Sequence, residues 1–223
     1  MGKNASKSQE EAAMANEVTP YIPNKPQMPY CYLTKEAVVE DGEVPVPLIA
    51  YLIGDSGVGK STLICQTLLQ SPQTDAICGY YPALRRLDTV LYSMALSEPS
   101  NLPEYTVLRQ VGYPTHHVVV LCFSLVHRPS WENIDKVWAP EALQYAPDIP
   151  RMVVGTHLTL RKPSDKSHVT IQEGKQLADK WGAYTYVEVD SLDMNINELE
   201  SFFLQKVVEG LTTPPSPFKP AKK

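Results

Sequence analysis

Long apolar runs, charge of a single sign and paired cysteines are all missing from this chain of 223 residues. No apolar stretch is long enough to cross a bilayer, and no secretory signal peptide is visible. The balance of 20 Lys and Arg against 25 Asp and Glu gives a net charge of −5, which argues against a nucleic-acid binder. The four cysteines form no C-x-x-C pair, a usage typical of a reducing compartment, so we predict a cytoplasmic protein.

The two ends of the chain differ in composition from its middle. Residues 1–45 offer little that could form a core, and residues 212–223 (TTPPSPFKPAKK) are rich in proline and lysine. We therefore predict a flexible N-terminal arm and a flexible C-terminal tail on either side of one domain at 46–211. The length of that middle part suits a single α/β domain.

Between the tails, strand-like runs alternate with helix-like segments. The runs are VPLIAYLIG, TVLYSMAL, HVVVLCFSL, PRMVVGT and YTYVEVDS, and the helix-like segments are 61–70, 130–145, 171–181 and 196–211. The last segment repeats apolar residues at a helical spacing, which predicts one buried face. This alternation, with near-continuous apolar strands, predicts an α/β fold with a mostly parallel central sheet and helices on both faces.

The stretch IAYLIGDSGVGKSTL (49–63) joins the first strand to the first helix and fits G-x-x-x-x-G-K-[ST], the P-loop pattern. Gly54 and Gly59 permit backbone angles that a side chain forbids, so successive N–H groups can point at phosphate oxygens. Lys60 supplies a cation for the outer phosphates, and Ser61 Oγ can bind Mg²⁺ beside the positive end of the helix. The predicted nucleotide site comprises Gly54, Asp55, Ser56, Gly57, Val58, Gly59, Lys60, Ser61 and Thr62.

Three further blocks carry a resemblance to the small GTPases, most closely to the Rho family. They are Phe123–Arg161, which contains Trp-x-Pro-Glu, Glu173–Ser191, and Glu104–Pro114. With the P-loop, the resemblance covers about residues 47–211. It implies the small-GTPase fold, binding of GTP and GDP with Mg²⁺, and signal transduction. The span from Arg161 to Ile171 has no room for the extra helix usual in Rho proteins, so we expect an atypical Rho-like member.

The family's switch II motif, Asp-x-x-Gly-Gln, is altered here. Counting back from EYTVLRQVGYP puts Glu98 at the Asp that holds magnesium, Asn101 at the Gly that meets the γ-phosphate, and Leu102 at the catalytic Gln. A second alignment, ranked lower, puts residues 109–112 there. Neither supplies a catalytic Gln, and leucine forms no hydrogen bond, so we assign no catalytic residue and expect slow or absent hydrolysis.

Two more departures concern the phosphate end. Ser56 stands where the family usually has Gly, and a side chain there crowds the transferring phosphate. The segment GYYPALRR resembles the family's switch I motif Tyr-x-Pro-Thr, with Ala83 at the magnesium-binding Thr. Because this segment aligns poorly, Thr74 is kept as the alternative.

The family's guanine-reading motif [NT]-K-x-D is replaced by Thr156, His157, Leu158 and Thr159. The family's Asp accepts two hydrogen bonds from guanine, whereas Thr159 offers one hydroxyl and no charge. This replacement can lower the affinity for guanine about tenfold or more, so we expect weak guanine preference. His157 either stacks its ring on the ligand side or faces solvent. The family's Ser-Ala-Lys becomes Asp190-Ser191-Leu192, where a backbone contact from Ser191 or Leu192 to the base can survive.

Three functions stay open. The first is an atypical Rho-like protein that binds GTP and GDP and hydrolyses GTP slowly or not at all. The second is a nucleotide-free pseudo-GTPase scaffold that acts through protein contacts. The third is a P-loop protein with relaxed base choice.

Both tails carry short motifs. Pro214–Lys219 fits P-x-x-P-x-[KR], which predicts docking to a Src-homology-3-type module, with a solvated end as the alternative. MGKNAS fits the myristoylation pattern with Gly2 as the acceptor, and Lys3 and Lys7 lie beside it. These features predict weak association with a cytoplasmic membrane face. The alternative is an ordinary N-terminus that carries no lipid. No cysteine follows Cys122, so we do not expect the lipidated C-terminal Cys of Rho proteins.

Overall fold

One six-stranded sheet forms the centre of the protein. The computed structural model describes residues 45–68, 80–87, 89–190 and 196–212. The strands follow the order β2-β3-β1-β4-β5-β6, and all neighbours are parallel except β2 and β3. Their bounds are β1 Val46–Ile53, β2 Tyr80–Leu87, β3 Val90–Ser97, β4 Val118–Ser124, β5 Arg151–Thr156 and β6 Thr185–Glu188. The predicted α/β fold with a mostly parallel sheet is confirmed.

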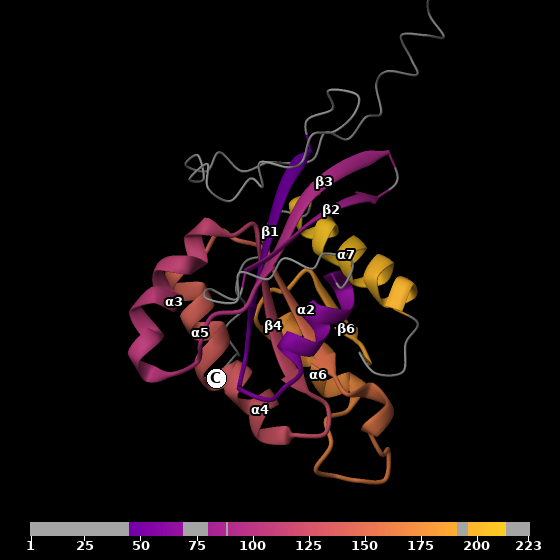
Figure 1. The fold of residues 1–223 in the computed structure, drawn as a ribbon. Helices are drawn as coiled ribbons and strands as arrows, with labels where there is room; N and C mark the ends of the chain where they lie inside the picture. The colour runs from indigo at the N-terminus through magenta and orange to yellow at the C-terminus, as the bar shows by residue number, and fades with distance from the viewer. Residues whose placement is uncertain (1–44, 69–79, 88, 191–195, 213–223) are drawn as a thin grey trace, which may run out of the picture.

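Helices cover both faces of this sheet (Figure 1). One face is covered by α2 (Lys60–Leu68) and α7 (Ile196–Thr212). The other is covered by α4 (Arg128–Asn133), the π-turn η5 (Ile134–Trp138), α5 (Ala139–Tyr145) and α6 (Ile171–Lys180), with α3 (Thr106–Gly112) beside α5. Short 3-10 turns lie at η3 (Pro103–Tyr105), η4 (Tyr113–Thr115) and η6 (Leu158–Leu160).

The apolar strands are continuous because the sheet is buried on both faces. In β1, Leu48 and Leu52 enter the core under α2 and α7, whereas Tyr51 and Ile53 enter the core on the opposite face. Alternate side chains of a strand point to opposite faces, so a sheet covered on both sides needs apolar residues at every position. All seven residues of β4 are buried for the same reason.

Strand β2 was not predicted from the sequence. Its segment GYYPALRR was interpreted as a switch loop with Ala83 at a magnesium-binding position. In the structure Ala83 lies inside β2 and pairs with Met94 of β3, so that alignment is wrong. The strand is antiparallel at the sheet edge, where Pro82 and the exposed Arg86 are tolerated. The alternative position, Thr74, lies outside the described residues.

Several other predictions also fall outside the described residues. They concern the N-terminal arm with Gly2, most of the proline-rich tail, and the pair Ser191 and Leu192. Within the described part of the chain, no helix has both the length and the apolar character that a membrane span requires.

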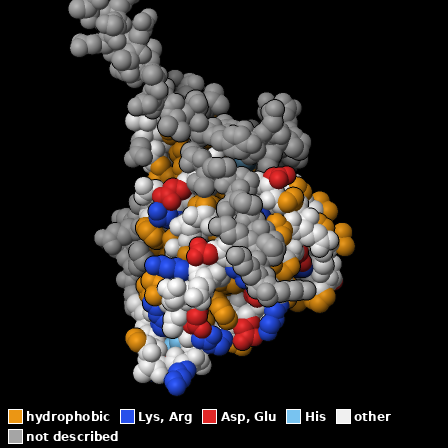
Figure 2. All heavy atoms as spheres, turned by 180° about the vertical axis from the view of Figure 1, so that it is seen from behind, with side chains coloured by type: hydrophobic (Ala, Val, Ile, Leu, Met, Phe, Trp, Pro, Cys, Tyr) orange, Lys and Arg blue, Asp and Glu red, His pale blue; other side chains and the backbone are white. Residues whose placement is uncertain are grey.

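The surface combines mixed charge with one apolar helix. Figure 2 shows the protein from behind, with acidic and basic side chains intermingled on the described part of that face. Helix α3 lies toward the right-hand edge of this view, where hydrophobic side chains gather. Val107, Leu108 and Val111 are 71%, 68% and 63% exposed. This helix therefore presents an apolar side to solvent.

Candidate functional site

The loops at one edge of the sheet bring the predicted site residues together. The P-loop (54–59) follows β1, and residues 98–102 follow β3. Residues 124–127 lie at the end of β4, 157–160 follow β5, and 189–190 follow β6. Because five of the strands are parallel, all of these loops lie at their carboxyl ends, where open α/β sheets bind ligands.

The shape of the P-loop requires glycine at both ends. Gly54 has a φ of 147°, and a Cβ on it would collide with the backbone carbonyl of Cys122 in β4. Gly59 has a φ of 88°, and its Cβ would lie 3.3 Å from His157 Nε2. These backbone conformations are rare for residues with side chains. Burial raises the pKa of the Cys122 thiol to about 12, so this group stays protonated beneath the loop.

The Lys60 ammonium is held by the start of the loop. Lys60 is 2% exposed, and its Nζ donates to the carbonyl oxygens of Gly54 at 3.0 Å and Asp55 at 2.7 Å. Nζ also lies 3.3 Å from Glu98 Oε1. Val58 is buried as well, whereas Ser61 and Thr62 are exposed at the start of α2. The loop thus fixes a cation beside the first turn of a helix, the arrangement that binds anions.

The segment after β3 is docked on the P-loop. Ser61 Oγ donates to Glu98 Oε2 at 2.6 Å, and Asn101 Nδ2 donates to the Gly54 carbonyl at 2.5 Å. Asn101 Oδ1 is buried and has no hydrogen-bond partner among the described residues. Leu102, at the expected Gln position, is 54% exposed. This placement agrees with the first alignment, because Arg109 of the second alignment lies in α3 instead.

Ser61 and Glu98 together fit a magnesium ion. Their oxygens are one hydrogen bond apart, and Mg²⁺ prefers oxygen ligands. The described residues contain no group of three or more His, Cys, Asp or Glu side chains that could hold a metal alone. Magnesium would therefore depend on these two side chains, water and the phosphates of a ligand, which is its usual environment in phosphate sites.

Asp55 belongs to the P-loop that was predicted to bind nucleotide through its backbone, and its side chain points toward the helices. Its carboxylate accepts hydrogen bonds from Asn133 Nδ2 and from Trp138 Nε1, each at 2.7 Å. Asn133 and Trp138 belong to α4 and η5, so this carboxylate fastens the P-loop to that helical segment. Sequence reasoning missed both residues. The Trp-x-Pro-Glu block that contains Trp138 was noted only as a family resemblance.

A buried polar network continues from Trp138 toward α3. The Arg109 guanidinium lies 5.3 Å from the Trp138 ring centroid and pairs with Glu141 through two hydrogen bonds of 2.8 and 3.0 Å. The Glu141 carboxylate raises the pKa of Arg109, so the cation is permanent. Tyr113 Oη also donates to Glu141, and burial raises the pKa of this phenol strongly. The network therefore fixes α3 against α5 close to the P-loop.

The loop after β5 is fixed to the P-loop from the other side. Thr156 Oγ1 lies 2.6 Å from the Val58 carbonyl oxygen, to which its hydroxyl donates, and 3.0 Å from that of Phe123. His157 has a left-handed φ of 61° and forms a hydrogen bond through Nδ1 with Ser124 Oγ at 2.8 Å. Its half-buried ring lies against Gly59, so it packs beside the P-loop.

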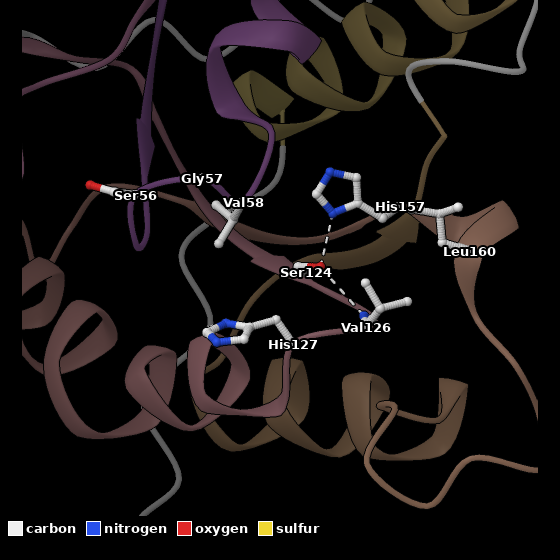
Figure 3. A pocket seen from close by; sticks show the side chains of 8 residues that line it. All are labelled: Ser56, Gly57, Val58, Ser124, Val126, His127, His157 and Leu160. Carbon is white, nitrogen blue, oxygen red and sulfur yellow. Dashed lines mark hydrogen bonds between the residues drawn. The ribbon is translucent and has the colours of Figure 1, made fainter.

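A hollow of about 350 Å³ opens between these loops (Figure 3). In Figure 3, Ser124 lies between His157 and Val126, and the His127 ring extends away from Val126. The Ser56 hydroxyl points away from this group. The lining residues are Ser56, Gly57, Val58, Ser124, Val126, His127, His157 and Leu160.

Thr159, the residue at the family's base-reading Asp, is bonded to a carboxylate from a different loop. Asp190 Oδ2 accepts from Thr159 N at 2.7 Å and from Thr159 Oγ1 at 2.5 Å. Asp190 is only 3% exposed, although its neighbours Ser191 and Leu192 lie outside the described residues. Sequence reasoning assigned Asp190 no role, because the pairing joins two loops 31 residues apart.

Comparison with known proteins places this arrangement in a family. A model described as the Ras family matches residues 50–209, which include the P-loop and every described loop at the site. A Ras-like GTP-binding protein, RhoL of Drosophila melanogaster, is 32% identical over 147 residues, which cover 65% of this chain and 77% of that protein. The chain belongs to the Ras family and is a Rho-like member of the small GTPases.

Proposed function

We propose that this protein binds GTP and GDP at the loop edge of its sheet, hydrolyses GTP slowly or not at all, and acts in signal transduction. The observation that supports this most strongly is the convergence of Lys60, Ser61 and Glu98 beside the P-loop. A cation, a hydroxyl and a carboxylate at that position serve outer phosphates and a magnesium ion. Family membership supplies the guanine nucleotide as the ligand.

The chain's own groups divide the work of holding phosphate. The N–H groups of the P-loop and the first turn of α2 bind phosphate oxygens, and the Lys60 ammonium stays beside them through its bonds to Gly54 and Asp55. Ser61 and Glu98 would hold Mg²⁺, which neutralises charge on the outer phosphates when it is bound. Thr156 and the Asp55–Trp138 bond keep the loop in this shape from two sides.

Slow hydrolysis follows from the residues beside the outer phosphates. Hydrolysis in this family requires a side chain that orients the attacking water, and Leu102 can neither donate nor accept a hydrogen bond. The Asn101 side chain is bonded to the Gly54 carbonyl, so the segment that would carry the catalytic group is tied to the P-loop. A bound triphosphate would therefore persist, and its dissociation would end the active state.

One observation favours the second candidate, a nucleotide-free scaffold. The Glu98 carboxylate contacts both Lys60 and Ser61 directly, and these are the two groups that a phosphate and its magnesium require. A carboxylate there is an internal anion that competes with the ligand. Measured binding separates this scaffold from the nucleotide-binding protein.

The test is a titration of the full-length chain with fluorescent GDP and with a non-hydrolysable GTP analogue, both in Mg²⁺. We expect Lys60→Ala to weaken binding by about 100-fold or more, because charged hydrogen bonds to the phosphates are lost. Lys136→Ala is the matched control, since Lys136 is an exposed lysine paired with Glu132 on a helix. Absence of binding by the wild type would leave the scaffold as the function, and equal binding by Lys60→Ala would contradict the role of the P-loop lysine.

A further inference from the structure

One apolar surface of the protein lies exposed on α3 and on the turn before it. Val111 follows Leu108 by three residues and Val107 by four, so these side chains share one side of the helix. Leu102 and Tyr105 precede them, and each of the five is at least 45% exposed. We call these five residues the α3 face. Contiguous apolar patches on a monomeric protein mark interaction sites.

The opposite side of α3 is fixed to the rest of the domain. Arg109 pairs with Glu141 of α5 through two hydrogen bonds, and its Nη1 donates to the Ser100 carbonyl at 3.2 Å. Tyr51 Oη of β1 donates to the Arg109 carbonyl at 3.0 Å. A surface that is already rigid loses little conformational entropy when it is covered. The α3 face is therefore a preformed docking surface.

The charge of the α3 face favours an occupant with positive charge. Between residues 102 and 115 the charged side chains are Glu104 and Arg109. Glu104 is exposed at the start of the face, whereas Arg109 is buried and paired with Glu141. Complementary charge sets the specificity of an interface more than its affinity. The occupant that suits this face is mainly apolar and carries a cation that can meet Glu104.

A segment of the N-terminal arm has this chemistry. Residues 20–33 read PYIPNKPQMPYCYL, in which Lys25 is the one charged residue. Proline recurs at every third position, at 20, 23, 26 and 29. A polyproline II helix has three residues per turn, so prolines at this spacing share one edge of it. Proline-rich segments dock on apolar surfaces that carry aromatic rings, such as the ring of Tyr105.

The arm is long enough to place this segment on the α3 face. It joins the domain at Val46, the first residue of β1, and α3 packs against Tyr51 of the same strand. The path along β1 from Val46 to Tyr51 is about 17 Å. Residues 34–45 can span about 40 Å when extended. A short tether also gives a local concentration on the order of millimolar, which favours this segment over a separate protein.

We propose that residues 20–33 dock on the α3 face of their own chain. Another protein that binds this face must then displace the arm, so the segment is an intramolecular inhibitor of binding at α3. The proposal departs from the expectation of a flexible arm at these residues. It does not depend on nucleotide binding.

The first test is a disulfide cross-link in the full-length chain, because two cysteines form a disulfide only when their Cα atoms come within about 7 Å. Cys31 lies in the segment, and Leu108→Cys supplies a thiol on the α3 face. Ile171→Cys, at an exposed position on α6, is the matched control. After mild oxidation and peptide mass mapping, the internal link from Cys31 to position 108 exceeds the link to position 171 by at least about fivefold.

Equal yields at the two positions overturn the inference. Disulfide-linked dimers on a non-reducing gel, in place of the internal link, also overturn it and assign the α3 face to a second copy of the chain. Native Cys65, exposed on α2, is an internal comparison, because α2 lies on the other face of the sheet.

The second test measures protection of the segment without new cysteines. Chymotrypsin cleaves after Tyr30 and Tyr32, and docking hides these bonds. Leu108→Asp places a charge on the α3 face and speeds their cleavage about tenfold, because cleavage follows the population of undocked arm. Ile171→Asp, also an exposed apolar residue, leaves the rate unchanged. Equal rates in the wild type and both variants overturn the inference and leave the face for a partner protein.

Discussion

The phosphate end and the base end of the site depart from the family pattern in different ways. At the phosphate end, backbone groups and one lysine form the site, and the replaced residues Glu98 and Asn101 still contact the P-loop. At the base end, recognition depends on side chains, and the change at Thr159 is accompanied by a carboxylate at Asp190. Backbone groups can bind phosphate although the side chains around them change, whereas recognition by side chains changes when one of them is replaced.

The largest effect that separates the two ends is on hydrolysis. Restoring Gln at Leu102 together with Gly at Ser56 should raise the single-turnover rate by at least about tenfold, because a glutamine can orient the attacking water. The base preference should stay the same, since Ser56 belongs to the P-loop and Leu102 to the segment after β3. Phosphate release from pre-bound GTP measures the rate. A wild type that already hydrolyses as fast as this variant would contradict the assignment of Leu102.

A smaller effect on GDP affinity, which depends on Mg²⁺, is expected for Glu98→Gln. Without Mg²⁺ this variant should bind GDP more tightly than the wild type by up to about tenfold, because Lys60 no longer pairs with a charged carboxylate. With Mg²⁺ the gain should disappear, because a metal ligand is weakened. Titrations with fluorescent GDP, with and without a chelator, measure both. Identical magnesium dependence in the two proteins would refute the role of Glu98.

Removing the hydrogen bond between Asp55 and Trp138 should affect only the phosphate end of the site. Trp138→Phe removes the N–H that Asp55 accepts, and we expect GDP affinity to fall about threefold to tenfold. The ratio of GTP to ATP affinity should not change. Trp131→Phe is the matched control, since Trp131 Nε1 has no hydrogen-bond partner among the described residues. Equal losses in the two variants would show that the Asp55 bond is not the cause.

The smallest expected effect is on the stability of the fold, at the start of α6, outside both ends of the nucleotide site. Glu173 closes a capping box with Thr170 at the start of α6, and its bond with Arg128 lowers its pKa to about 2. A lowered pKa means that the ionised form stabilises the fold above about pH 4.5, and that this contribution is lost as pH falls toward 2. Glu173→Gln should cost about 1 kcal/mol at pH 7, a modest value because the pair is partly exposed.

Urea unfolding of the wild type and of Glu173→Gln at pH 7 and at pH 3 measures this effect. The difference in unfolding free energy should shrink at the lower pH. A difference that stays constant would mean that the charge of Glu173 contributes nothing. Nucleotide affinity at pH 7 should be equal in the two proteins.

Local patterns in the sequence were enough to predict most of the fold and the P-loop. The apolar runs predicted β1 and β3 to β6, because strands buried on both faces carry a continuous apolar signal. Strand β2 was not predicted because an edge strand can carry charge and proline, as Arg86 and Pro82 show. The P-loop motif is contained in a few consecutive residues, so Lys60 and Ser61 could be assigned directly.

The rest of the site could not be predicted because it joins distant segments. Trp138 and Asp55 are 83 residues apart, and Thr159 and Asp190 are 31 residues apart. Each residue of such a pair looks ordinary in its own segment, and only the sheet order makes them neighbours. Aligning Thr159 alone could not show its two hydrogen bonds to Asp190, because that carboxylate lies in a different loop.

The most direct measurement is the identity of the nucleotide that the purified wild-type chain carries. The protein is denatured after purification, and the released small molecules are separated by ion-exchange chromatography and quantified against protein. A guanine nucleotide site with slow hydrolysis predicts close to one guanine nucleotide per chain, with GTP retained alongside GDP. Release of adenine nucleotide, or of no nucleotide at all, would contradict the account.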